Sequence, residues 1–215
     1  MEMNHKVNRR RLTRSAAVSI PLACLALLTT PAGAAAANPS DTAANDVTQP
    51  YKCQVNTTQG LPYARGFTGT APDTVAVGHK FTAEIDPAPI TPNPVHNTYA
   101  HDLTLTFQLP GNATLIGYKL TGGDTPTTSY VTGGTLVLQA PGPFPAGVAF
   151  DLPTVQLRLK ATHSGVVTTT AGGTGYEDYG FGWDFIPSAS EGGGPGTLRC
   201  YPDPVAALTS TTVES

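Results

Sequence analysis

The stretch His101-Asp102-Leu103-Thr104-Leu105-Thr106-Phe107-Gln108-Leu109-Pro110-Gly111 decides the fold class. Its leucines and its phenylalanine alternate with threonine and glutamine, which is the period of a strand with one apolar and one polar face. Pro110-Gly111 then predicts a turn. The same alternation recurs in Val155-Gln156-Leu157-Arg158-Leu159-Lys160. We therefore expect half-buried strands in an antiparallel sheet.

Glycine and proline recur at short intervals through the rest of the chain, and no segment shows a sustained apolar helix period. We expect further strands over residues 51–56, 65–69, 74–77, 80–86, 114–121, 127–132, 135–140, 165–170, 179–186, 197–201 and 208–213. Gly133-Gly134 lies between two of them and predicts a tight hairpin turn. Many short antiparallel strands indicate an all-β protein, and we predict an immunoglobulin-like antiparallel β-sandwich.

Residues 1–37 have the organisation of a secretory signal peptide. Arginines at positions 9–11 and 14 precede an apolar run over residues 16–28, and the small residues that follow provide a cleavage site after Ala34 or after Ala37, of which we use Ala37. The arginines leave both the general and the twin-arginine export route open, whereas Cys24 lies too early in the apolar run for a lipoprotein anchor. We expect a signal peptide over residues 1–37, a flexible lead-in over 38–50 and one β-sandwich domain over 51–215.

Removal of this leader changes both the charge and the cysteine count. It takes five Lys and Arg and one Glu, which leaves 7 basic against 14 acidic residues and a net charge of −7. An acidic chain without a basic cluster gives no reason to expect nucleic acid or an anionic membrane as partner. Cys53 and Cys200 remain, and in an oxidising compartment such a pair predicts one disulfide. We expect a secreted, extracellular protein without a membrane span.

The densest candidate site lies over residues 176–185, which combine three carboxylates with five aromatic rings. Strand alternation places Tyr179, Phe181, Trp183 and Phe185 on one face. That face either fills the sandwich core or forms an exposed strip, in which Tyr179, Phe181 and Trp183 are the candidate ligand contacts. A glycosidase pair among the carboxylates is disfavoured, because neighbours along a strand point apart.

Metal and catalytic motifs are weak. His96 and His101, with Asp102, have donor side chains, but an offset of five puts the two histidines on opposite faces of a strand, so we expect a polar loop there. Asp86, Asp102, Asp124 and Asp151 have no calcium-binding spacing. The sequence contains no nucleophile elbow, zinc-protease motif or phosphate-binding loop. We therefore predict no catalytic residues, no metal site and no cofactor.

Segments 101–111, 133–138, 145–147 and 152–159 resemble the repeat domains of bacterial surface proteins, in which a strand ending near Leu-Pro-Gly is followed by a hairpin and a further core strand. The chain from Tyr51-Lys52-Cys53 to Cys200-Tyr201-Pro202-Asp203-Pro204 is also similar to secreted immunoglobulin-like β-sandwich proteins of high-GC Gram-positive bacteria that carry no assigned function. The resemblance implies the fold and implies no catalytic residues.

These observations predict a secreted, non-catalytic module that binds envelope polymer or protein at the cell exterior. Two alternatives stay open. One is a secreted hydrolase with a site assembled from distant residues, and the other is a secreted enzyme inhibitor that uses the proline-rich loop over residues 86–95. A hydrolase needs titratable groups that converge in a concave pocket, whereas a binding module needs an exposed surface.

Overall fold

The computed structural model describes residues 42–215, so the predicted signal peptide lies outside the described residues. Within this range all regular elements are β-strands, and it includes no helix that is long and apolar enough to cross a membrane. The all-β prediction is confirmed.

Fourteen strands make up the described chain. They are β1 (Thr42–Val55), β2 (Thr58–Pro72), β3 (Thr74–Ala76), β4 (Lys80–Pro87), β5 (Asn97–Gln108), β6 (Ala113–Thr121), β7 (Thr128–Thr132), β8 (Thr135–Ala140), β9 (Phe144–Pro145), β10 (Thr154–Ala161), β11 (Gly165–Ala171), β12 (Phe181–Pro187), β13 (Gly196–Pro202) and β14 (Ala207–Glu214). The two-residue β9 is the one strand without a counterpart in the sequence-based prediction.

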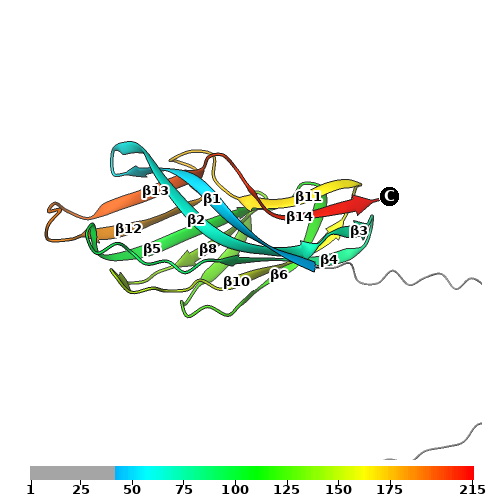
Figure 1. Ribbon diagram of the computed structural model, residues 1–215, viewed down its shortest axis with the longest axis horizontal. Helices are drawn as coiled ribbons and strands as arrows, with labels where there is room; N and C mark the ends of the chain where they lie inside the picture. Colours follow the sequence, from blue (N-terminus) through cyan, green and yellow to red (C-terminus); the bar gives the residue numbers. More distant parts are fainter. Residues whose placement is uncertain (1–41) are drawn as a thin grey trace, which may run out of the picture. The chain divides into compact units, whose positions relative to one another are not determined.

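The strands form one continuous sheet that folds back on itself into two layers (Figure 1). One layer has the order β2-β4-β10-β6. The other contains β13, β12, β5, β11 and β14, with β8 and β7 beside β5, and β1 joins the two layers. All neighbouring strands pair antiparallel except β14 and β3, which are parallel. This arrangement confirms the predicted antiparallel β-sandwich.

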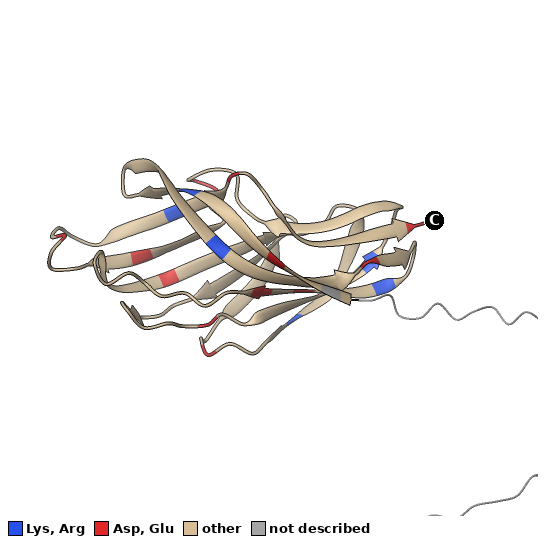
Figure 2. Ribbon diagram, in the orientation of Figure 1, with Lys and Arg blue, Asp and Glu red and all other residues tan. Residues whose placement is uncertain are grey.

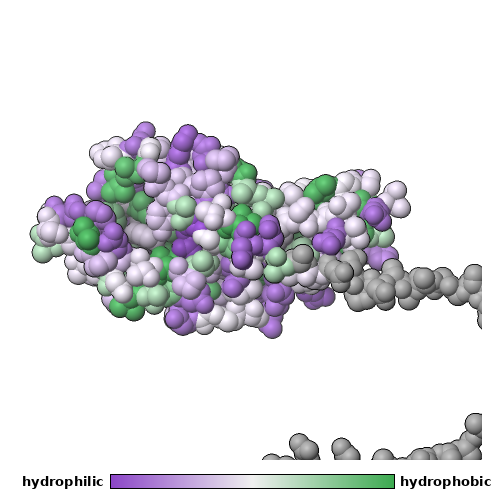
Figure 3. Space-filling model, in the orientation of Figure 1, coloured by the Kyte–Doolittle hydropathy of each residue, from purple (hydrophilic) through white to green (hydrophobic). Residues whose placement is uncertain are grey.

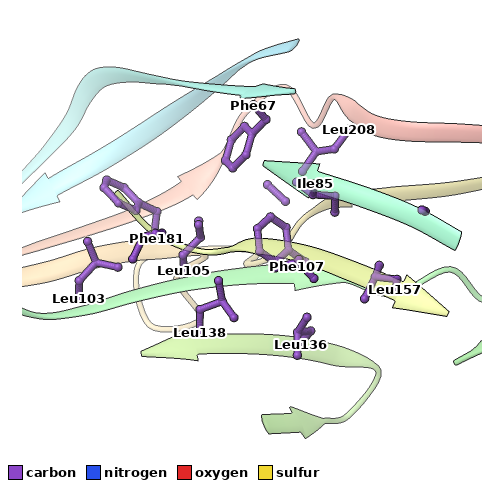
Figure 4. Close-up of a cluster of buried hydrophobic side chains, with 14 of the residues drawn as sticks. Phe67, Ile85, Leu103, Leu105, Phe107, Leu136, Leu138, Leu157, Phe181 and Leu208 are labelled. Atoms are coloured by element: carbon purple, nitrogen blue, oxygen red, sulfur yellow. The ribbon is translucent and has the colours of Figure 1, made fainter. Parts of the chain in front are cut away.

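The core lies between the layers. Leu105 and Phe107 on β5, which face inward as the alternation predicts, are buried beneath Phe67 on β2 and Ile85 on β4 (Figure 4). The rings of Phe67 and Phe107 meet edge to face with their centroids 6.1 Å apart. Each such side chain stabilises the fold by roughly 1.5–3 kcal/mol on burial. Because Leu105 and Phe107 occupy the inner face of β5, only the outer face of this strand can contact a ligand.

The predicted disulfide joins Cys53 and Cys200. The two residues are direct partners on the antiparallel strands β1 and β13, and their Cα atoms are 4.0 Å apart. In immunoglobulin domains the conserved disulfide crosses between the two sheets, whereas this one links neighbouring strands. It closes a loop with a sequence separation of 147 residues, so it fastens the beginning of the domain to its end.

The flexible lead-in predicted over residues 38–50 is wrong from Thr42 onward, because β1 begins there and pairs with β2 from Thr42 opposite Pro72. The segment is small and polar, and backbone hydrogen bonds to β2 order it without an apolar pattern. Gln49 adds a side-chain anchor: its amide donates to the Pro204 carbonyl at 2.7 Å and accepts from the Ala206 amide at 2.8 Å. Sequence periodicity cannot reveal such a strand.

Candidate functional site

The aromatic residues of β12 belong to the core. Phe181 is 0% and Trp183 is 6% exposed, and their rings meet edge to face at 5.2 Å. Tyr63 on β2 packs against both rings. The hypothesis of an exposed aromatic strip is therefore wrong for Phe181 and Trp183, and the alternative of a core strand is correct. The inner face of β12 is closed to ligands.

Tyr179 lies on the opposite, outer face. The prediction placed it with Phe181, but β12 begins only at Phe181, so strand alternation does not extend to Tyr179. Its ring covers Gly182, where an added Cβ would lie 3.2 Å from two ring carbons. The Arg199 guanidinium lies 4.7 Å from the ring centroid, within range of a cation–π contact. Of the three predicted ligand contacts, only half-exposed Tyr179 lies on an outer surface.

Arg199 connects Tyr179 to a polar cluster further along β12. Its Nη2 atom donates to Asp184 Oδ1 at 2.5 Å, and its Nη1 atom donates to the Trp183 carbonyl at 2.9 Å. Both charged side chains are partly exposed. Figure 2 shows the basic segment of β13 beside the acidic segments of β12 and β5. Arg199 therefore fixes the Asp184 carboxylate on the outer face.

A β-bulge in β5 brings two further polar residues to this place. The register with β12 shifts between Gly182 and Asp184, so Asp102 and Leu103 together lie opposite one residue of β12. Asp102 takes the left-handed backbone conformation, with φ 51°. Because of the extra residue, His101 and Asp102 both avoid the core, although they are neighbours in sequence.

The bulge creates a cluster that the sequence analysis missed. His101 is the cross-strand partner of Asp184, and its Nδ1 atom lies 2.8 Å from Asp102 Oδ2. One donor atom from each of His101, Asp102 and Asp184 lies within 4.8 Å of the other two. His96 does not join them; its Nδ1 atom lies 2.7 Å from Glu191 Oε1. Asp184 is distant in sequence from the histidine motif, so only the strand register could have identified it.

Two shallow hollows lie on the outer face of β5, one near each end. The hollow at the start of β5 is lined by apolar rings and by His101, and its main residues are Tyr99, Pro141, Pro143 and Pro145. The rings of Tyr99 and His101 lie 5.8 Å apart. This hollow therefore adjoins the His101–Asp102–Asp184 cluster.

The hollow at the end of β5 is polar. Its lining includes Thr106 and Gln108 of β5, Thr135 of β8, and the loop residues Asp178 and Tyr179. Thr135 donates to the Gln108 side chain at 3.3 Å, and Thr174 donates to Asp178 at 2.7 Å. Hydroxyl, amide, carboxylate and ring therefore meet in one groove.

The two hollows and the cluster lie along the same strand, and we call this surface the β5 strip. It follows the outward residues of β5 from Tyr99 through His101 and Thr106 to Gln108, with Tyr179 at its side. At about 3.3 Å per strand residue its length is about 30 Å. In contrast, the face visible in Figure 3 carries hydrophobic residues in small separate groups within a polar surface.

Three of the four aspartates considered for calcium, Asp86, Asp124 and Asp151, interact with one another, and Asp102 is not among them. Asp124 Oδ1 accepts from the Asp151 backbone amide at 2.7 Å, and this hydrogen bond is the main cause of the lowered pKa of Asp124. Burial, followed by the charges of Asp86 and Asp124, raises the pKa of Asp151. Among residues 42–215, the donor atoms of these three do not meet closely enough to form a metal-binding group.

No family model and no curated protein matches this chain. Among solved structures, it is similar to a putative membrane-anchored protein from Corynebacterium diphtheriae, with 16% identity and a TM-score of 0.43 over 79% of this chain and 38% of that one. It is also similar to the cohesin module of a family 33 glycoside hydrolase from Clostridium perfringens, with 14% identity and a TM-score of 0.37 over 77% of this chain and 98% of that one. The chain thus spans well under half of the first of these proteins, and similarity at this level does not extend to function.

Proposed function

We propose that this protein is a secreted, non-catalytic module that binds an extended, hydroxyl-rich polymer of the cell exterior along the β5 strip. The observation that carries the proposal is the position of two open hollows, one apolar and one polar, near the ends of a strip about 30 Å long. A long, shallow surface suits a chain-like ligand better than a small molecule, which is usually enclosed in a deep cavity.

The residues of the polar hollow match such a ligand chemically. Thr135 offers a hydroxyl group, Gln108 offers an amide, and the carboxylate of Asp178 accepts hydrogen bonds from hydroxyl groups. Tyr179 adds an aromatic ring with a polar tip, which is the type of side chain that binds partly apolar, partly wet surfaces. A polysaccharide of the envelope has this combination of hydroxyl groups and apolar ring faces.

Secretion is supported by the leader-like residues 1–37 and by the disulfide. Disulfides form and persist in oxidising compartments and are rare in the cytosol. The excess of acidic residues also favours a neutral or cationic partner over an anionic one.

A secreted hydrolase is the second candidate, because His101 lines a hollow and lies beside two carboxylates. We rank it lower because both hollows are open, and because Asp184 is already bonded to Arg199. The inhibitor alternative has less support, since Ile90 and Pro92 anchor the proline-rich loop in the protein.

Co-sedimentation with purified Gram-positive cell walls tests the proposal. We expect the protein to sediment with walls that have been stripped of protein by protease, and Tyr179→Ala and Gln108→Ala to bind about three- to tenfold more weakly. Gln156→Ala is the matched control, since Gln156 lies on β10 in the other layer. Equal binding by all variants contradicts the β5 strip. Binding that disappears after protease treatment identifies a protein ligand instead.

A further inference from the structure

We propose that His101, Asp102 and Asp184 form a binding site for a divalent transition-metal ion, with Zn²⁺ as the preferred ion. The inference is independent of polymer binding. It rests on the three donor atoms that lie within 4.8 Å of one another on the outer face of β5 and β12.

The donor set selects the type of metal. An imidazole nitrogen with two carboxylate oxygens suits zinc and its neighbours in the first transition row, whereas calcium and magnesium prefer sites made of oxygen alone. Arg199 Nη2 bonds Asp184 Oδ1, so Oδ2 of the same carboxylate is the oxygen left for the ion. With neutral His101, the two aspartates and Arg199 sum to a charge of −1 before the ion binds.

The spacing is close to what a tetrahedral ion needs. With metal–ligand bonds of about 2.0 Å, neighbouring ligand atoms are roughly 3.3 Å apart. His101 Nδ1 and Asp102 Oδ2 are 2.8 Å apart, which is a hydrogen-bond distance. An ion bound between these two atoms requires them to separate by about 0.5 Å, and a donor pair at the 4.8 Å limit must close by about 1.5 Å. Both side chains are partly exposed, so they have room to do so.

The partial exposure of the three side chains also leaves the ion accessible from outside the protein. Three protein ligands leave a fourth position of a zinc ion open to water or to an oxygen atom of another molecule. The hollow lined by Tyr99 and Pro143 adjoins His101, so this fourth position lies beside the apolar end of the β5 strip. The site would therefore be an accessible one, in contrast to the closed sites that stabilise small zinc domains.

Isothermal titration with ZnCl₂, on protein purified without a polyhistidine tag and without polymer, tests the inference. We expect one ion per chain at this site, and binding about tenfold weaker or more in His101→Gln and Asp184→Asn. His96→Gln is the matched control, because His96 is also exposed and bonded to a carboxylate but lies outside the cluster. Asp102→Asn tests the third ligand with a residue that tolerates the same positive φ.

Cobalt provides an independent readout, since Co²⁺ in a tetrahedral N/O site gives visible absorption bands that Asp184→Asn should abolish. The proposal is overturned if the wild-type protein shows no binding at Zn²⁺ concentrations up to about 1 mM. It is equally overturned if His101→Gln binds as tightly as His96→Gln. The His101 side chain is partly exposed, so its variant remains informative even if Asp184→Asn fails to fold.

Discussion

The guanidinium carbon of Arg65 lies 5.1 Å from the centroid of the Phe181 ring, inside the sandwich. Arg65 is only 5% exposed, and its burial lowers its pKa. Among residues 42–215, no carboxylate forms an ion pair with Arg65. The guanidinium instead contacts aromatic ring faces, and its Nη2 atom donates a hydrogen bond to the Ala88 carbonyl at 2.7 Å. A buried cation held in this way makes stability sensitive to the shape of the side chain.

Replacement of Arg65 by alanine should destabilise the domain by about 3 kcal/mol, because it leaves a cavity beside Phe67 and Phe181. Arg65→Met keeps most of the volume and removes the desolvated charge, so its free energy of unfolding should stay within about 1 kcal/mol of the wild type. Urea denaturation measures both. Equal losses in the two variants would mean that the charge, rather than the packing, stabilises the fold.

Loss of the disulfide should lower the free energy of unfolding by about 4–5 kcal/mol, because Cys53 and Cys200 close a loop with a sequence separation of 147 residues. The double variant Cys53→Ala/Cys200→Ala is compared with wild-type protein in urea, with and without reductant. Reductant should have little effect on the double variant. Thiol titration of the denatured, unreduced protein provides the control, and two reactive thiols would contradict the bond.

The core strands could be predicted because apolar and polar side chains alternate along them, and this alternation indicates which face is buried. Leu105 and Phe107 alternate with threonines, and both occupy the inner face that this pattern assigns to them. The tight turn at Gly133-Gly134 could also be predicted, because glycine favours the positive φ that both residues adopt. Where burial and turn chemistry decide the structure, the sequence was sufficient.

The candidate site was not predictable, because it depends on register. Nothing near Asp102 indicates that it occupies a bulge, and without the bulge His101 and Asp102 would point to opposite faces. The position of Tyr179 was not predictable either, because the face on which its side chain lies depends on the residue at which β12 begins. The beginning of β1 was missed because backbone pairing with β2, rather than an apolar pattern, orders it.

Gly69 should not tolerate any side chain. An added Cβ would lie 1.7 Å from the backbone oxygen of Leu208, which cannot move without disturbing β14. We expect Gly69→Ala to destabilise the domain by more than about 2 kcal/mol, or to prevent folding. Gly111→Ala is the control, because open space surrounds that position. Thermal unfolding of both variants measures the difference, and equal melting temperatures would contradict the close approach of β2 and β14.

Asp151 and Asp124 should affect the pH dependence of stability in opposite directions. The raised pKa of Asp151 means that its ionised form opposes folding above this pKa, and that the penalty disappears below the unfolded-state pKa of about 4. Asp151→Asn should therefore stabilise the protein at pH 7, and the gain should vanish as the pH falls below about 4.

The lowered pKa of Asp124 has the opposite sign. Its stabilising contribution is present above the unfolded-state pKa and is lost as the pH falls through the lower folded-state pKa. Asp124→Asn should therefore destabilise the protein at pH 7, with a difference that shrinks in acid. Urea midpoints measured between pH 3 and 7 compare the two variants. Shifts of the same sign in both would contradict the hydrogen bond from the Asp151 amide.

The single tryptophan reports directly on the two interpretations of the aromatic strand. Trp183 is buried against Phe181 and Tyr63, so its fluorescence should peak at short wavelength and resist quenching by iodide in the native protein. Both properties should change together on unfolding. Addition of a polymer that binds the β5 strip should leave the emission of Trp183 nearly unchanged, because the ring faces the core and Tyr179 lies on the other side of β12. Iodide quenching of the native protein, or protection of Trp183 by the polymer, would instead mean that the inner face of β12 is accessible and takes part in binding.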